Sequence, residues 1–403
     1  MELFWLEHKK LWRKKIVKIC VLLCFVYCVI FGSILSFQWF CFGSSDDYIS
    51  AFGNNFDGYT VIKDSQEYAL SFGGELTDET LQKIVSDYQQ MEADGMEEEL
   101  EKTDWQIVNS WLGTLYPELR DTSNYKTMIS YVDPDKLTGF YERRQQVLDE
   151  FLEVSGQVGA EKEFLHQIER KVEKPFRYEW VEGWSMLLGS MVADLGVVMA
   201  LFLGIVLSSL FAGEWHDNTS TLVLTTRNGW GKIALAKILT GLAFTVELFA
   251  LLAVSNVISQ LFFMGTAGWD MPIQNIKLIA VAPMNMLQAE IYEYAFVLLG
   301  AIGFAGIVMF ISAAVKNNVL TLLLSLAVVY GPMMIAEYLP YEMQKALDLI
   351  PLVGSSTDIF RTNTFRIFGK LIWSPYLLIT IPVLIGILCM PFAIKSWSRR
   401  MKA

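Results

Sequence analysis

The chain has 403 residues, of which 53% are hydrophobic and 19% are charged, and its formal net charge is −11. A soluble domain of this size carries more charge, and a disordered chain far less apolar surface, so the composition predicts an integral membrane protein. The acidic balance excludes nucleic acid as an expected partner, because binding phosphates requires a clustered Lys/Arg surface.

The negative charge is concentrated in one part of the chain. Residues 43–183 carry 30 Asp and Glu against 13 Lys and Arg, a net charge of −17, whereas the rest of the chain carries +6. The sequence therefore predicts an acidic, water-soluble domain inserted into an apolar and mildly basic scaffold.

Long stretches without charged residues locate the expected membrane spans, since a helix needs about 20 apolar residues to cross a hydrocarbon core of about 30 Å. The stretches lack the two-residue alternation of a membrane β-barrel. We expect an all-α integral membrane protein with six transmembrane helices and an α-rich (α+β) extracellular domain between the first and the second. The expected spans are 19–42, 184–212, 238–264, 294–315, 319–337 and 371–394.

Lys and Arg in the short connecting segments set the expected orientation. With a cytoplasmic N-terminus, the inner segments hold 14 of these residues and the short outer loops hold five, in accord with the positive-inside rule. Both termini are then cytoplasmic, and the first span is a retained signal anchor. The inner segments are 1–18, 213–237, 316–318 and 395–403, and the outer ones are 43–183, 265–293 and 338–370.

The acidic domain is expected to fold without disulfides, because all five cysteines lie in the first and last expected spans. Short strands are predicted at 59–63 and 68–72. Thr77 is expected to cap a helix in which apolar residues recur at helical spacing from Leu81 to Tyr88.

Two antiparallel helices are predicted at 140–154 and 161–172, joined by a hinge at Ser155-Gly156. Each has an apolar stripe that is expected to face the core. The two stripes are Val147, Phe151 and Val154, and Phe164, Ile168 and Val172.

Two carboxylates fall within expected spans, where a central Asp costs about 2.5–3.5 kcal/mol on insertion scales. Asp194 lies in the second span and Glu247 near the middle of the third. Both are candidates for a translocation path, where they could bind a basic group of the cargo or relay a proton. The alternative is that each is protonated or hydrogen-bonded to a neighbouring helix.

Glycines at 300, 303 and 306 share one face of the fourth expected span. Small residues allow close backbone approach in membranes, so this face is expected to pack against another helix or another protomer.

The connection between the second and third spans carries the most specific pattern. It reads Phe-Ala-Gly-Glu-Trp-His-Asp-Asn-Thr-Ser-Thr-Leu-Val-Leu-Thr-Thr-Arg-Asn-Gly-Trp-Gly-Lys-Ile-Ala-Leu-Ala-Lys over residues 211–237. This segment resembles the corresponding loop of ABC-2 type exporter permeases. In that family a Glu ends the second helix, a Gly-Thr or similar pair follows, and an apolar stretch leads through a basic turn to a Lys. Here Asn218 replaces the common Gly, and Thr226 stands where many members have Pro.

The order of one helix, a large outer insertion and five helices is similar to a branch of this family from Gram-positive bacteria. The segments 174–178, 182–184 and 268–274 also resemble that branch. The resemblance implies a multi-pass permease of the bacterial plasma membrane, paired with a second permease copy and with separate ATPase subunits. Its cargo would be amphipathic or hydrophobic, such as a peptide or a lipid-like molecule.

In the family this loop docks on the ATPase, and the resemblance carries that role to matching positions here. These are Glu214, Thr219, Leu222, Leu224, Thr225, Arg227, Lys232 and Lys237. The apolar residues could fill a groove on the partner, while the charged ones set the register. The alternative is a solvated connector whose Lys and Arg reach to the membrane surface.

The outer segment 338–370 contains a predicted short amphipathic helix with apolar residues at 343, 346, 347 and 350. By resemblance this region would form re-entrant helices that act as an outer gate. The alternative is a helix lying passively on the bilayer surface.

A phosphate-binding G-x-x-x-x-G-K-[S/T] motif is absent from the sequence, as is any catalytic Ser/His/Asp or Cys/His set. We therefore expect no enzymatic activity, no cofactor and no metal in this chain, with ATP bound by the partner subunit. Two other classes stay open: a proton-coupled secondary transporter that uses Asp194 and Glu247, and a membrane sensor or anchoring protein that uses the acidic domain.

Overall fold

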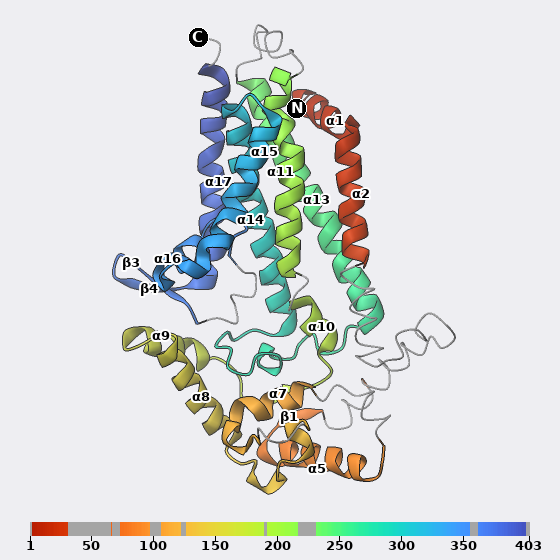
Figure 1. Ribbon diagram of the computed structural model, residues 1–403, viewed down its shortest axis with the longest axis vertical. Coiled ribbons are helices and arrows are strands. Elements are labelled where there is room, and N and C mark those ends of the chain that lie inside the picture. The colour runs from red at the N-terminus through yellow and green to blue at the C-terminus, as the bar shows by residue number, and fades with distance from the viewer. Residues whose placement is uncertain are drawn as a thin grey trace, which may run out of the picture.

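The computed structural model describes residues 2–30, 66, 73–96, 106–121, 126–188, 192–216, 231–354 and 362–399. Within them, long helices form a bundle, and most of the acidic domain lies at one end of it (Figure 1). The strands expected at 59–63 and 68–72 lie outside the described residues.

Five helices in the described part of the chain are long and apolar enough to cross a membrane. They are α11 (Val192–His216), α13 (Lys232–Met264), α14 (Met286–Ala314), α15 (Asn318–Ile335) and α17 (Ser374–Arg399). The fold is therefore that of a multi-pass, mostly helical membrane protein. Helix α2 (Lys15–Val29) contains residues 19–29 of the expected first span.

Several helices extend beyond the expected spans. Helix α11 continues to His216, so that Glu214 lies in its last turn. Helix α14 begins at Met286 because Asn285 and Gln288 form a capping box, in which each side chain accepts a hydrogen bond from the other residue's backbone N–H.

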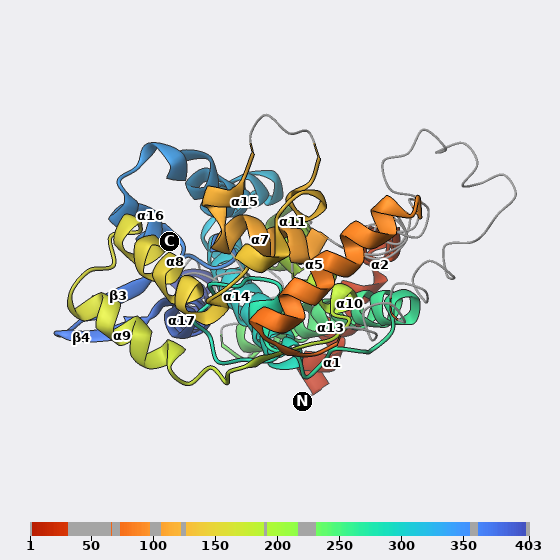
Figure 2. The ribbon, with the colours of Figure 1, turned by 90° about the horizontal axis from the view of Figure 1, so that it is seen from below.

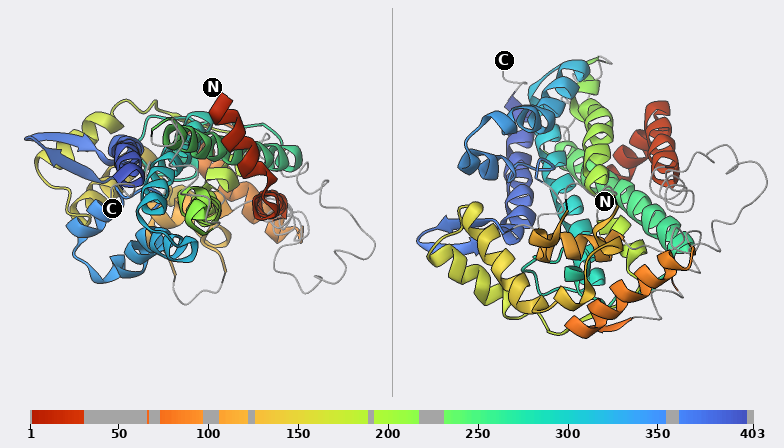
Figure 3. Two further views of the ribbon diagram at one scale, coloured as in Figure 1. Left: turned by 90° about the horizontal axis from the view of Figure 1, so that it is seen from above. Right: turned by 60° about the horizontal axis from the view of Figure 1, so that its bottom comes forward.

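The N-terminal segment, expected only to be basic, forms a separate helix α1 (Glu2–Arg13). Extended backbone at Lys14 separates α1 from α2. Helix α1 packs against α13 (Figure 3), with Leu11 buried and the Trp12 ring edge-on to Phe244 at a centroid distance of 5.7 Å.

Glycines allow α14 to approach α17 closely in the centre of the bundle. A Cβ added to Gly303 would lie 2.3 Å from the Pro382 carbonyl oxygen, and one added to Gly306 would lie 2.4 Å from that of Gly386. Two glycines of the face expected in the fourth span therefore pack against a helix of the same chain, while Gly300 lies against Leu352.

The acidic domain combines helices with one small sheet. Thr77 caps α5 as predicted, because its hydroxyl accepts a hydrogen bond from the Thr80 N–H. The domain's helices and strands are α5 (Asp78–Ala93), α7 (Gln106–Leu115), α8 (Phe140–Val154), α9 (Ala160–Glu169), β1 (Gly74–Leu76) and β2 (Phe176–Tyr178). Strands β1 and β2 pair antiparallel, joining the two ends of the described domain.

The two helices predicted at 140–154 and 161–172 are present, but the predicted inward faces are partly wrong. Phe151 and Val154 are 39% and 89% exposed. Residues on other faces of the helices are buried instead: Phe140, Arg144, Leu148 and Leu152 of α8, and Leu165 and Glu169 of α9. Apolar spacing misses this arrangement because charged residues occupy the buried faces of both helices.

The segment before α17 forms an antiparallel hairpin, β3 (Thr364–Ile367) and β4 (Lys370–Trp373). A helical start at 371 is therefore wrong, and α17 begins at Ser374. The short helix α16 (Tyr341–Leu347) is present, but it buries Lys345 and leaves Met343 exposed. Seen from below, α9 lies beside this hairpin (Figure 2).

Shorter elements complete the described structure. Helix α10 (Glu182–Met186) leads from the acidic domain to the bundle. The 3-10 turns are η3 (Pro117–Leu119), η4 (Met128–Ser130), η5 (Pro134–Lys136), η7 (Ile273–Asn275) and η8 (Ala336–Tyr338).

Candidate functional site

A buried ionic cluster joins the two helices that border residues 217–230. Glu214 of α11 is 4% exposed and Lys237 of α13 is 1% exposed. The Lys237 ammonium donates to Glu214 Oε1 at 2.8 Å and to Glu7 Oε2 of α1 at 2.8 Å. Lys10 of α1 also donates to Glu214 Oε1, at 2.6 Å. We call these four side chains the Lys237 cluster.

The Lys237 cluster connects α1 to both α11 and α13. A further contact supports it, because the Lys14 ammonium donates to the Ser209 hydroxyl at 2.8 Å. Removing one partner of a buried ion pair is strongly destabilising, since the other charge stays buried without compensation. The cluster therefore holds α1 and the helical ends on either side of residues 217–230 in one arrangement.

The structure describes three of the eight residues predicted to couple to an ATPase. Glu214 and Lys237 contact each other and α1, whereas Lys232 is exposed at the start of α13. The remaining five lie outside the described residues: Thr219, Leu222, Leu224, Thr225 and Arg227. Contact with an ATPase stays a prediction for this set.

Glu247 of α13 is bound by α1. Its Oε2 accepts a hydrogen bond from the Trp12 indole N–H at 3.0 Å, and its Oε1 lies 3.1 Å from His8 Nε2. The Glu247 side chain is 43% exposed. This geometry favours the alternative in which Glu247 is hydrogen-bonded to a neighbouring helix. Asp194 lies in α11, but its side chain is outside the described part.

A second set of buried polar contacts joins the acidic domain to the loop between α13 and α14. Arg144 of α8 is fully buried and donates to the carbonyl oxygens of Leu278 at 2.7 Å and Ala280 at 3.2 Å. It also donates to Glu169 of α9 at 2.5 Å, and the Lys174 ammonium lies 2.8 Å from the same carboxylate. One buried side chain thus links two helices of the domain to a loop of the bundle.

The charges around Glu169 determine its protonation. Burial raises the pKa of this carboxyl, but hydrogen bonds from Lys174 and Arg144 lower it more, so that its pKa lies below the usual range. Glu169 is therefore an anion at neutral pH.

The same loop is held by Trp111 and Asn275. The Trp111 indole N–H donates to the Asn275 carbonyl at 3.0 Å, and the Asn275 side-chain amide donates to the Arg177 carbonyl at 2.9 Å. Together with Arg144, these contacts connect the domain to the segment that leads directly into α14.

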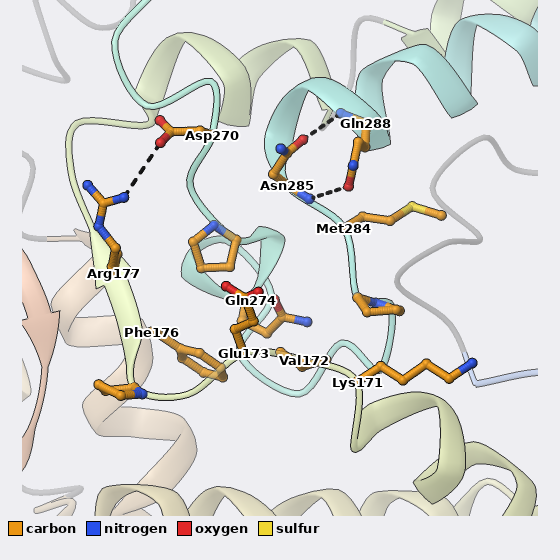
Figure 4. Close-up of a pocket in the computed structure, with 13 residues that line it drawn as sticks. Lys171, Val172, Glu173, Phe176, Arg177, Asp270, Gln274, Met284, Asn285 and Gln288 are labelled. Carbon is orange, nitrogen blue, oxygen red and sulfur yellow. Dashed lines mark hydrogen bonds and ion pairs between the residues drawn. The ribbon is translucent and has the colours of Figure 1, made fainter.

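A cavity of about 360 Å³ lies between β2 and this loop (Figure 4). Charged and amide side chains line it, among them Lys171, Glu173 and Gln274, and Arg177 faces Asp270 across one edge at 3.6 Å. Within the described residues, no group of three His, Cys, Asp or Glu side chains could hold a metal ion.

Two carboxylates in the bundle were not expected from the sequence. Glu290 and Glu293 precede the charge-free stretch at 294, and so fell in an expected loop, whereas the structure places them inside α14. The capping pair Asn285 and Gln288 is the local signal that could have extended the helix to include them.

The fold and these contacts place the chain in the class of multi-pass, mostly helical membrane proteins. Its acidic domain is bound to one end of the helix bundle. Comparisons with family models, curated proteins and solved structures find no match for the chain.

Proposed function

We propose that the chain is the transmembrane permease subunit of an ATP-driven exporter of the ABC-2 type. A separate cytoplasmic ATPase subunit would supply the energy, and a second permease copy, identical or homologous, would complete the transporter. The cargo would be an amphipathic or hydrophobic molecule, such as a peptide or a lipid-like compound.

The arrangement of the helix ends supports this topology. Helix α1 begins, and α17 ends, at the end of the bundle that faces away from the acidic domain (Figure 1). Five crossings would leave those two ends on opposite sides, so α2 would supply a sixth. The acidic domain would then lie outside the cell, with the loop 217–230 on the cytoplasmic side.

The Lys237 cluster is the observation that carries the proposal. A motor subunit can move membrane helices only if the loop it grips is joined stiffly to them. Here the helices on both sides of residues 217–230 are connected through Glu214 and Lys237, and both are connected to α1. A force on the loop would therefore move three helices together.

Charge reversal at Arg227 tests this proposal. We expect Arg227→Glu to lower the amount of ATPase that co-purifies with the native complex at least about tenfold, because like charges at an interface cost several kcal/mol. Thermal stability of the permease should not change.

The control for that experiment is Lys277→Glu, an exposed position in the loop between α13 and α14. It should leave co-purification unchanged. Equal ATPase recovery from both variants would remove Arg227 from the docking surface. A native complex that exports cargo without any ATPase would contradict the proposed function as a whole.

A further inference from the structure

Two carboxyl groups that form no ion pair with a described side chain are buried one turn apart in α14. Glu290 is 4% exposed and Glu293 is fully buried. Within the described residues, the Glu293 carboxyl has no hydrogen-bond partner, and the Tyr294 hydroxyl is the donor at the Glu290 carboxyl. Glu293 differs in this respect from Glu247 and Glu169, which both have donors.

The face of α13 opposite the pair is polar. Asn256 and Gln260 are 2% and 1% exposed. The Asn256 amide donates to the Tyr294 hydroxyl at 3.0 Å, while Asn256 Oδ1 has no partner in the described chain. Tyr294 follows Glu290 by one turn, and its hydroxyl lies beside the Glu290 carboxyl. Gln260 donates to the Met186 sulfur of α10 at 3.3 Å.

No described Lys or Arg side chain forms an ion pair with Glu290 or Glu293. The described charged side chains on helices packed against α14 are Glu182 of α10, Glu214 of α11, Lys232, Lys237 and Glu247 of α13, and Lys395 of α17. None of them hydrogen-bonds to Glu290 or Glu293. Asp194, His216 and Arg399 also lie on these helices, with side chains outside the described part.

Two ionised carboxylates would be costly in this position. Both would be buried without a cation from the described side chains, Glu293 would have no donor there either, and the two like charges would repel each other. A bound metal ion does not fit the described side chains, because no third His, Cys, Asp or Glu ligand is present, and hard cations take about six oxygens. A proton requires only one carboxyl oxygen.

We propose that Glu290 and Glu293 form an intramembrane proton-binding site, which holds both carboxyls neutral in this conformation. The site ionises, releasing protons to water, when α13 and α14 separate enough to hydrate it. Proton binding then favours the closed arrangement of the two helices, and low pH favours it more. This inference is independent of the ATPase and goes beyond the proposed function.

A hydrophobic carbodiimide reports buried protonated carboxyls. The carboxyl proton moves to a carbodiimide nitrogen, the carboxylate oxygen bonds to the central carbon, and the adduct rearranges to a stable N-acylurea. We would label the full chain in lipid nanodiscs with dicyclohexylcarbodiimide, from acidic to alkaline pH, and locate adducts by peptide mass spectrometry. We expect adducts at Glu290 or Glu293 that decrease as pH rises. Glu247 is the internal control, since its carboxylate is 43% exposed and already accepts a hydrogen bond from the Trp12 indole N–H.

Infrared spectroscopy provides the deciding measurement, because it does not depend on access of the reagent. The wild-type chain should show the C=O band of protonated carboxyls in a low-polarity site, and E290Q/E293Q should lose it. The isosteric Gln variant should keep its apparent Tm, since it replaces a neutral group by a neutral group. A wild-type spectrum without this band, or a band unchanged in the double variant, would overturn the proposal.

Discussion

Arg144 is the side chain on which the junction between the acidic domain and the bundle most depends. We expect Arg144→Ala to lower the free energy of unfolding by about 3–5 kcal/mol, because Glu169 and two loop carbonyls lose a buried charged donor. Unfolding of the solubilised chain can be followed by tryptophan fluorescence. Arg170→Ala is the matched control, since Arg170 pairs with Glu163 at 3.4 Å on the surface and should cost about 0–1 kcal/mol. Similar losses in both variants would contradict this role for Arg144.

The lowered pKa of Glu169 predicts a pH dependence for the same junction. A carboxyl whose folded pKa lies below its unfolded value of about 4.3 stabilises the fold above that value. Its contribution is lost as the pH falls through the folded pKa. We therefore expect the wild-type Tm to fall in this acidic range, and Glu169→Gln to have a lower Tm at neutral pH with a flatter acidic profile. If the Tm of the wild type and of Glu169→Gln changed with pH in the same way, Glu169 would be ruled out as the titrating group.

The carboxylates show how far the sequence predicts individual site residues. Asp194 and Glu247 can be found in the sequence because each interrupts a long apolar stretch. Glu290 and Glu293 precede such a stretch, so they were assigned to the loop before it. The partners of Glu247 could not be predicted at all, because Trp12 and His8 lie 235 and 239 positions away in the sequence. Contacts of that range depend on how α1 packs.

At the scale of single elements, α1 depends on the Lys237 cluster for its position. We expect Lys237→Met to remove a positive charge that pairs with the Glu7 and Glu214 carboxylates. Helix α1 should then bind α13 less tightly. Hydrogen exchange of residues 2–13 should become at least about tenfold faster, since breaking a buried pair costs about 3–5 kcal/mol. Lys232→Met, at an exposed position of the same helix, should leave this exchange unchanged. Unaltered exchange in Lys237→Met would show that apolar contacts alone hold α1.

The contact between α14 and α17 makes a second prediction at this scale. Gly303→Ala places a methyl group against the Pro382 carbonyl, so the helices must move apart. We expect a loss of about 1–3 kcal/mol, measured as a lower apparent Tm. Gly331→Ala in α15 is the control, because a Cβ there has no neighbour within 4 Å. A Tm for Gly303→Ala equal to that of the control would mean that the two helices can separate freely.

Elements with local signals were predictable from the sequence, and those defined by distant contacts were not. Thr77 and the spacing of Leu81 and Ile84 predict α5 correctly, because caps and amphipathic faces act within a few turns. The inward face of α8 escaped prediction because Arg144 binds carbonyls more than 130 positions away. The hairpin β3–β4 was also missed, although Gly369 at φ +79° provides its turn.

At the scale of the whole molecule, the described part of the acidic domain contacts both the loop before α14 and the hairpin before α17. Besides the Arg144 junction, the Thr364 hydroxyl of β3 donates to the Gln157 side chain at 2.8 Å, and Arg366 donates to Glu161 at 2.5 Å. The domain therefore spans the loop before α14 and the hairpin before α17. Any change in the separation of α14 and α17 would act on both attachments.

A disulfide at the second attachment tests whether the domain moves during the proposed transport. We expect the double variant Gln157→Cys/Thr364→Cys to lose most export activity when oxidised and to regain it when reduced, since the crosslink fixes the domain to β3. Export of a fluorescent cargo from intact cells measures the effect. Val158→Cys with Thr364→Cys is the control, because Val158 is 57% exposed. Full export by the oxidised Gln157 variant would show that the domain and hairpin stay together throughout the cycle.

The position of α1 has a consequence for biosynthesis. Glu7 lies 230 positions before its partner Lys237. When α1 emerges from the ribosome, the helix that will bind it has not yet been translated. Helix α1 therefore cannot form this contact until α13 has been translated. A nascent chain stalled before α13 would leave this helix undocked, so an early segment of the polypeptide reaches its final place only after the middle of the chain has been synthesised.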